Sequence, residues 1–181
     1  MLRRLFFAVA ILPVVCLLSQ LNTEAQTPVA LPYTMTTMGG LAPMAATAGT
    51  QCPGLATGVV STDAFGDGCL AVNGIFGAGG RGGVQVDSYG NIIVADDVDS
   101  IIHVINPATG IMTKLAGLGT ACAGKLDSAG DGCLAATQSL TASERGIGLD
   151  PYGNVFLPGY GDHLVRMICR TASPLCSPAQ V

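Results

Sequence analysis

The chain has 181 residues, of which 11% are charged and 25 are glycine. Few charges and many glycines favour tight turns between buried strands over a solvated helical bundle, so we expect a protein made mostly of β structure. The formal net charge of -4 would repel phosphate backbones, which argues against a nucleic-acid partner.

The chain begins with a pattern typical of a secretory signal. Two arginines precede an apolar run over residues 5–18, and a small-residue site ends at Ala25. The run is shorter than the roughly 20 residues that a membrane-spanning helix needs, so residues 1–25 are predicted to be a cleaved signal peptide. We therefore expect a secreted protein, extracellular or periplasmic, with no membrane attachment after cleavage and a flexible leader at residues 26–33.

Seven cysteines occur in the chain, and all but Cys16 lie beyond the predicted signal peptide. An even number of cysteines in an exported chain predicts disulfides, and the closely spaced pairs that zinc sites use do not occur. Cys69 and Cys133 stand in the same repeated motif, each with one cysteine upstream, so local pairing is expected. The predicted bonds join Cys52 to Cys69, Cys122 to Cys133, and Cys169 to Cys176.

An internal repeat appears when the chain is slid along itself by about 63 positions. Residues 81–94 align with residues 145–157, and both segments contain Asp-x-Tyr-Gly-Asn. The upstream sequence Gly-Asp-Gly-Cys-Leu-Ala occurs unchanged at residues 66–71 and 130–135. A period of this length indicates an array of similar structural units.

Each unit consists of short apolar runs broken by turn residues, which is typical of strands rather than helices. The Tyr-Gly-Asn tip of the repeat supplies the positive-φ positions that a tight hairpin needs. Four antiparallel strands joined in this way form one propeller blade. The strands predicted in the first unit cover residues 83–87, 92–96, 101–106 and 111–116.

Residues 83–96 read Gly-Val-Gln-Val-Asp-Ser-Tyr-Gly-Asn-Ile-Ile-Val-Ala-Asp and resemble the NHL repeat. The linkers around residues 115–121 and 130–132 are similar to those of long-period bacterial NHL-repeat proteins. The resemblance implies an all-β fold of β-propeller type, with four-stranded antiparallel blades. The second copy departs from the pattern at Pro158, which fits only a strand edge or a bulge.

Counting the predicted strands gives about two blades. Residues 34–40 resemble the fourth strand of the complete blade, and prolines and cysteines follow Ile168 where the second blade would need its own fourth strand. The predicted organisation is a pair of blades over residues 34–168, with units at about 66–116 and 130–168, and a disulfide-stapled tail at 169–181.

Two blades leave the ring incomplete, because closed propellers need about four to eight. The sequence leaves two outcomes open: a partial propeller with a capped edge, or a ring completed by other copies that exchange the strand at residues 34–38. A homo-oligomer is therefore one predicted state.

Catalytic motifs are not found: the sequence has two histidines, no Gly-x-Ser-x-Gly elbow and no His-Glu-x-x-His motif. Propellers related to NHL proteins include lactonases and amidating lyases, which use metal-binding histidines or acidic residues around a central pore. His103 and His163 stand at non-equivalent positions of the repeat, so we expect packed or surface side chains. We predict no catalytic residues and no cofactor.

Polar loops on a repetitive β scaffold commonly form a binding face. Asp99 and Ser100 in the first unit, and Asp162 and His163 in the second, occupy the same inter-strand loop and are the predicted binding residues. Tyr89 and Tyr152 stand at matching turn tips. They are candidates to stack on a partner or to pack on a neighbouring hairpin.

Asp96, Asp97 and Asp99 form an acidic group that offers oxygen ligands for Ca²⁺. Because the second unit retains only Asp162 and no complete calcium-loop motif is present, an acidic loop without a metal is the preferred interpretation.

The remaining aspartates of the repeat suit turns. Asp87 and Asp150 precede the tight hairpins, where hydrogen bonds to the backbone explain them. Asp67 and Asp131 each lie between two glycines, which favours a turn over a binding loop.

These patterns favour a secreted, non-enzymatic NHL-repeat interaction protein, which binds a protein, a glycan or another copy of itself. Two alternatives stay open: a structural filament or surface-layer subunit, and a fragment of a lactonase-like or lyase-like propeller enzyme.

Overall fold

The computed structural model describes residues 34–77, 82–120, 122, 126, 131–140 and 146–176. The predicted signal peptide and leader, and residues 177–181 of the predicted tail, lie outside the described residues. Residues Thr36–Val181 form one compact body, and the description below concerns it. Among the described residues, no helix is long and apolar enough to cross a membrane.

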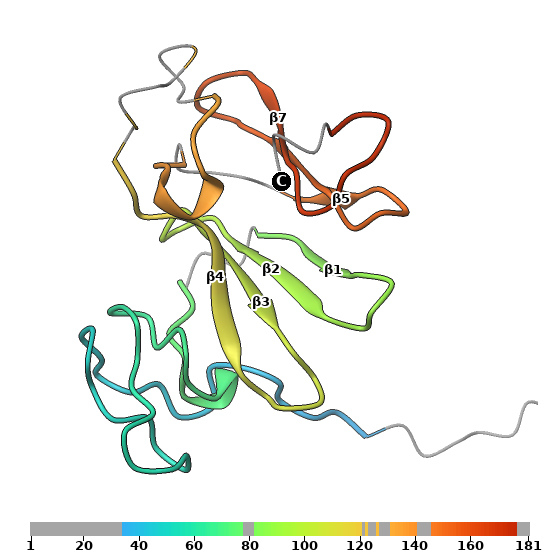
Figure 1. Cartoon of the computed structure of the whole chain (residues 1–181). Coiled ribbons are helices and arrows are strands. Elements are labelled where there is room, and N and C mark those ends of the chain that lie inside the picture. The colour runs from blue at the N-terminus through green and yellow to red at the C-terminus, as the bar shows by residue number, and fades with distance from the viewer. Residues whose placement is uncertain are drawn as a thin grey trace, which may run out of the picture. The chain divides into compact units, whose positions relative to one another are not determined.

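The described part of the chain forms two antiparallel sheets and contains no α-helix (Figure 1). The all-β fold class is therefore confirmed, and each strand of the first sheet overlaps its predicted range. The strands of the first sheet are β1 Val84–Val86, β2 Ile92–Asp96, β3 Ile101–Ile105 and β4 Met112–Gly117, in that order. The second sheet contains β5 Gly148–Leu149, β6 Val155–Pro158 and β7 Val165–Ile168. Two short 3₁₀ turns, η1 Ala71–Asn73 and η2 Ala135–Thr137, precede the two sheets in the chain.

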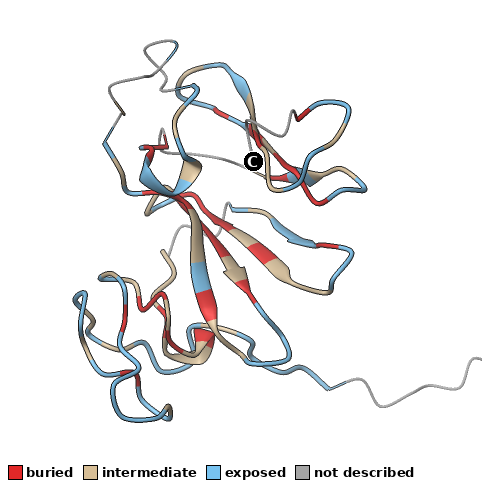
Figure 2. Cartoon of the chain, viewed as in Figure 1, coloured by how far each residue is buried: buried red, intermediate tan, exposed pale blue. Residues whose placement is uncertain are grey.

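One face of the first sheet is only partly covered, and we call it the open face of the first sheet. Alternate side chains of a strand point to opposite faces, so cross-strand partners share a face. Val84 pairs with Val94, Val86 pairs with Ile92, and Ile92 pairs with Ile105, which places these five side chains together. Figure 2 shows β1 exposed along its length, while buried residues gather on β2, β3 and β4.

The core lies between the other face of the first sheet and one face of the second, which we call the packed faces. Ile93, Ala95 and Ile102 supply the first packed face, and Val155, Leu157 and Ile168 supply the second. Ala116, Leu140 and Ile147 complete this cluster of buried residues. Burial of apolar area at roughly 25 cal/mol per Å² makes this contact the main source of stability.

The second sheet also has an open face. Phe156 pairs with Met167, and Val165 lies two residues before Met167 on the same strand, so the three side chains share a face. Val165 is exposed, while Phe156 and Met167 are partly buried. The sulfur atoms of Met167 and Cys176 lie 3.6 Å apart, so the C-terminal loop covers part of this face.

Two contacts outside the core join the sheets. A Cβ atom at Gly83 would lie 2.8 Å from the Gly146 Cα atom, so a glycine is needed where β1 approaches the segment before β5. Arg170 Nη1 lies 3.1 Å from Asp87 Oδ2, which connects the end of the second sheet to the first hairpin.

Residues 34–40 do not form the strand that the sequence predicts. Instead, Gly40, Ala42 and Met44 donate backbone hydrogen bonds to the carbonyls of Ala71, Val72 and Asn73. The chain lies beside η1 rather than at a sheet edge. The segment passes close to Phe76 instead: a Cβ atom at Gly39 would lie 2.8 Å from the Phe76 ring.

The second sheet ends after three strands, as predicted, and residues 169–176 form turns and bends. Pro158 is the last residue of β6, where it pairs with Val165. The partner strand on the other side, β5, reaches only as far as Phe156, so the missing N–H of the proline breaks no ladder bond.

The three predicted disulfides are confirmed. They join Cys52 to Cys69, Cys122 to Cys133, and Cys169 to Cys176, with sequence separations of 17, 11 and 7 residues. Three disulfides in one small chain indicate folding in a non-reducing compartment.

The two sheets offer a matched pair of positions for testing the core. Ile102 and Val165 are related by the repeat, but their side chains are 1% and 75% exposed. We expect Ile102→Ala to lower the free energy of unfolding by about 2–4 kcal/mol, because it leaves a cavity between the packed faces. Val165→Ala should change it by less than about 0.5 kcal/mol.

Denaturant titration of the oxidised protein at low concentration measures both values. Equal losses for the two variants would contradict the assignment of packed and open faces.

Candidate functional site

The predicted binding loops adopt the same backbone conformation in the two units. Ser100, between β2 and β3, and His163, between β6 and β7, have φ values of 56° and 60°, uncommon for residues other than glycine. Asp162 accepts a hydrogen bond from the backbone N–H of Leu164 through Oδ1, and Arg166 Nη2 lies 3.2 Å from its Oδ2. The structure therefore places Asp99 and Ser100 in one sheet's loop and Asp162 and His163 in the equivalent loop of the other.

The acidic group considered for Ca²⁺ is used within its own loop. Asp96 Oδ1 accepts hydrogen bonds from the N–H groups of Val98 and Asp99, and its Oδ2 accepts one from Gly77. Burial and the neighbouring charge of Asp96 raise the pKa of Asp99. Among the described residues, no three acidic, histidine or cysteine side chains are grouped to hold a metal ion, so the structure does not gather Asp96, Asp97 and Asp99 into such a site.

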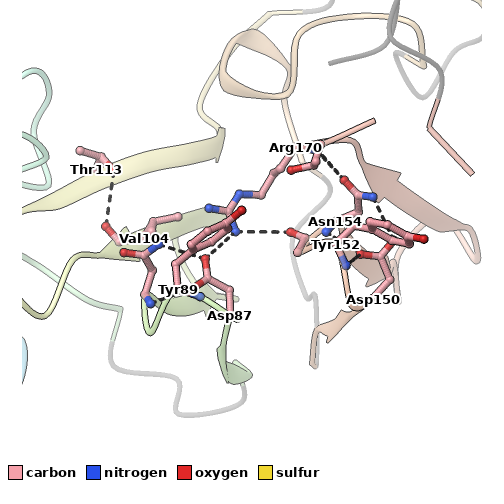
Figure 3. A network of polar contacts seen from close by, with 11 residues as sticks. Asp87, Tyr89, Val104, Thr113, Asp150, Tyr152, Asn154 and Arg170 are labelled. Atoms are coloured by element: carbon pink, nitrogen blue, oxygen red, sulfur yellow. Dashed lines mark hydrogen bonds and ion pairs between the residues drawn. The ribbon is translucent and has the colours of Figure 1, made fainter. Parts of the chain in front are cut away.

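The two hairpin tips are copies of one hydrogen-bonded turn (Figure 3). Asp87 Oδ1 accepts hydrogen bonds from the N–H groups of Tyr89 and Asn91, and the same set recurs at the second tip with Asp150 as acceptor. The predicted turn role of both aspartates is confirmed. Tyr89 and Tyr152 stand out from these tips with side chains 81% and 48% exposed, so both are available to a partner.

Arg170 ties the two tips together (Figure 3). Its Nη1 donates to Asp87 Oδ2 and to the Gly153 carbonyl, and its backbone N–H donates to Asn154 Oδ1. The guanidinium therefore links the hairpin tip of the first sheet to that of the second.

A buried cluster of titratable side chains lies between the N-terminal loop and β3. The side chains of Asp67 and His103 are fully buried, and His103 Nδ1 lies 3.1 Å from Asp67 Oδ1. The Phe76 ring packs edge-on against the imidazole, with 5.5 Å between ring centroids. Burying such a pair is costly unless the two groups hydrogen-bond, so this contact fixes the loop to the strand.

Asp63 extends the cluster. Its Oδ1 accepts hydrogen bonds from the N–H groups of Phe65 and Asp67. Within the described chain, Asp63 Oδ2 and Asp67 Oδ2 are buried without a hydrogen-bond partner.

The surroundings shift the pKa values of the two aspartates in opposite directions. Burial, opposed in part by His103, raises the pKa of Asp67. Burial acts against Asp63 as well, but hydrogen bonds to its carboxylate, including those from the backbone N–H groups of Phe65 and Asp67, hold its pKa below the usual value. The site therefore favours the neutral form of Asp67 more than that of Asp63.

Sequence reasoning missed this cluster, because it assigned Asp67 to a turn and His103 to a packed or surface position. The repeat contained a signal: the residues equivalent to Asp67 and His103 are Asp131 and Arg166, again an acid and a base. Asp131 and Arg166 line one small cavity together in the second unit.

The open face of the first sheet is an accessible apolar surface. It contains a shallow groove of about 400 Å³, and Val84 and Val86 along its edge are each 61% exposed. Among the described residues, the groove walls carry no charged side chain and consist of Met38, Gly39, Phe76, Val84, Val86, Ile92, Val94 and Ile105. An apolar groove on an exposed sheet face is typical of a macromolecular binding site.

No protein-family model matches the chain, and no curated protein matches it. The resemblance to the NHL repeat therefore stays a prediction from the residues that carry it. The geometry of the open face and of the buried cluster is the basis for inferring function.

Replacing Asp67 by Asn is expected to change how stability depends on pH. Because folding raises the pKa of Asp67 above 3.8, the native state binds more protons than the unfolded chain between 3.8 and the raised value. This group's contribution to stability is therefore lost as pH rises through that window. The variant has an amide in place of the carboxyl group, so residue 67 cannot titrate. Its stability should therefore not decrease through this pH window.

The measurement is the free energy of unfolding of the disulfide-intact protein between about pH 3.5 and 7. Ile102→Ala serves as a control, since it should lower stability by a similar amount at every pH. Parallel pH curves for the wild type and Asp67→Asn would contradict a raised pKa of Asp67.

Proposed function

We propose that this chain is a secreted, non-enzymatic interaction protein of the NHL-repeat β-propeller type, whose sheets serve as blades and whose open face of the first sheet binds a macromolecular partner. The observation that carries the proposal is the apolar groove along Val84 and Val86. Their equivalents in the second unit, Ile147 and Leu149, take part in the core.

The propeller assignment is supported by the repeat and its strand order. The first unit is a four-stranded antiparallel meander, and its sheet packs face to face on the sheet of the second unit. Both properties are those of adjacent blades in a propeller. The Gly-Val-x-Val-Asp resemblance to NHL repeats agrees with them.

Secretion is supported by the signal-like first 25 residues together with the three disulfides. Binding is favoured over catalysis because the best-coupled acid and base, Asp67 and His103, are fully buried and are used to fix a loop. The exposed surface instead offers apolar side chains and turn-tip tyrosines, which suit recognition.

Site-specific photo-crosslinking tests this function. A photoreactive phenylalanine analogue at Val86 should crosslink to a discrete partner in the exported fraction of producing cells. The same analogue at the neighbouring Gln85 is the control, because that exposed side chain points to the opposite face.

Adducts from position 86 but not from position 85 are the expected result, because only one of the two side chains points into the groove. The mass of the adducts distinguishes a second copy of the chain from a different protein or a glycan. Equal or absent crosslinking at the two positions would count against a binding role for the open face.

A further inference from the structure

We propose that the occupant of the open face of the first sheet is a second copy of this chain, which docks there with the open face of its own second sheet. The inference rests on the proposed binding role of the first open face and goes further by naming the partner and the surface that the partner uses. The contact is head to tail, since the two surfaces are different.

The contact inside the chain supplies the template. The repeat relates the packed face of the second sheet to the open face of the first: Val155, Leu157 and Ile168 correspond to Ile92, Val94 and Ile105. The same shift relates the packed face of the first sheet to the open face of the second. Ile93 and Ile102 there correspond to Phe156 and Val165.

Each chain therefore carries both halves of the same contact twice. One copy of each half is buried in the core between the sheets, and the other is only partly covered, with Ile105 buried against Ala71 and Met112. Ile147 is 9% exposed in the core, while its equivalent Val84 is 61% exposed. Ile102 is 1% exposed, while its equivalent Val165 is 75% exposed. A second copy that repeats the internal packing would cover both exposed sets together.

The strand sequences themselves are apolar on both faces. β2 reads Ile-Ile-Val-Ala before its final aspartate, and β6 reads Val-Phe-Leu before Pro158. Continuous apolar runs of this kind are typical of strands buried on both faces, whereas half-exposed strands alternate apolar and polar residues.

The chemistry of the two open faces is compatible. The described walls of the first groove are apolar side chains and a glycine. The open face of the second sheet consists of exposed Val165 and of Phe156 and Met167, which are partly buried, with Met167 beside the C-terminal loop. Joining them desolvates no charged side chain of either set, so the penalty that opposes burial of charges does not arise.

The contact uses sheet faces instead of an exchanged strand. Gly40, Ala42 and Met44 hydrogen-bond to η1, and Met38 and Gly39 form part of the groove wall. The proposed contact therefore includes these residues as part of a sheet face. Because one copy joined to another still leaves one open face of each kind, the association continues until it closes as a ring or extends as a filament.

Two substitutions at exposed positions test the proposal on the purified, oxidised chain. Val86→Glu places a charge on the open face of the first sheet, and Val165→Glu places one on the open face of the second. The wild type should show concentration-dependent growth in sedimentation velocity and light scattering. Each variant alone should remain monomeric, because each has lost one half of the contact.

The decisive sample is an equimolar mixture of the two variants. Each retains the half that the other has lost, so the mixture should form a one-to-one dimer that grows no further. The double variant Val86→Glu/Val165→Glu should neither self-associate nor bind either single variant. Circular dichroism checks each fold, and Val86→Thr and Val165→Thr, which keep the β-branched shape, serve as a second pair.

A wild type that stays monomeric up to about 1 mM would overturn this inference. So would self-association of Val165→Glu alone, since that variant keeps only the first open face and would then be pairing it with itself. In either case, crosslinking from position 86 to a different molecule would leave the proposed function intact. Loss of that crosslinking as well would end both.

Discussion

Two sheets that are apolar on both faces pack against each other in this protein, and the rest of the structure depends on that contact. Ile93, Ala95 and Ile102 meet Val155, Leu157 and Ile168 across it. The small residue Gly83 and the Arg170–Asp87 pair lie outside the core, where they fix how closely the sheets approach. Each sheet has a second apolar face, which this contact does not bury, although the strand sequences are typical of strands buried on both faces.

The buried Asp67–His103 pair fixes the polypeptide that covers part of the remaining surface. A register shift at Ile102/His103 in the pairing of β3 with β4 interrupts the regular ladder beside this histidine. The Cys52–Cys69 bond closes the same loop two residues after Asp67. A disulfide and a buried polar network acting on one loop restrict it to a single position against β3 and Phe76.

Local features of this fold were predictable, because they are encoded over a few residues. β2 has the predicted bounds, and the Asp-x-Tyr-Gly-Asn turns form the hydrogen bonds expected of them. The strand expected at residues 34–40 is absent. Its absence was not predictable, because the close approach of Phe76 to Gly39 depends on tertiary structure. Asp67 and His103 are 36 residues apart in the chain. The only sequence signal for their contact was that the equivalent repeat positions also carry an acid and a base.

Val84 and Val86 stay exposed in the native chain because the segment beside the groove is held in place. Covering them from within would require residues 38–77 to move over the groove, and that movement would break the hydrogen bonds to η1 and the contact of Asp67 with His103. The cost of exposing an unpaired buried aspartate and histidine opposes this rearrangement. A partner that binds at the proposed site would therefore meet a preorganised groove and lose little binding free energy to ordering it.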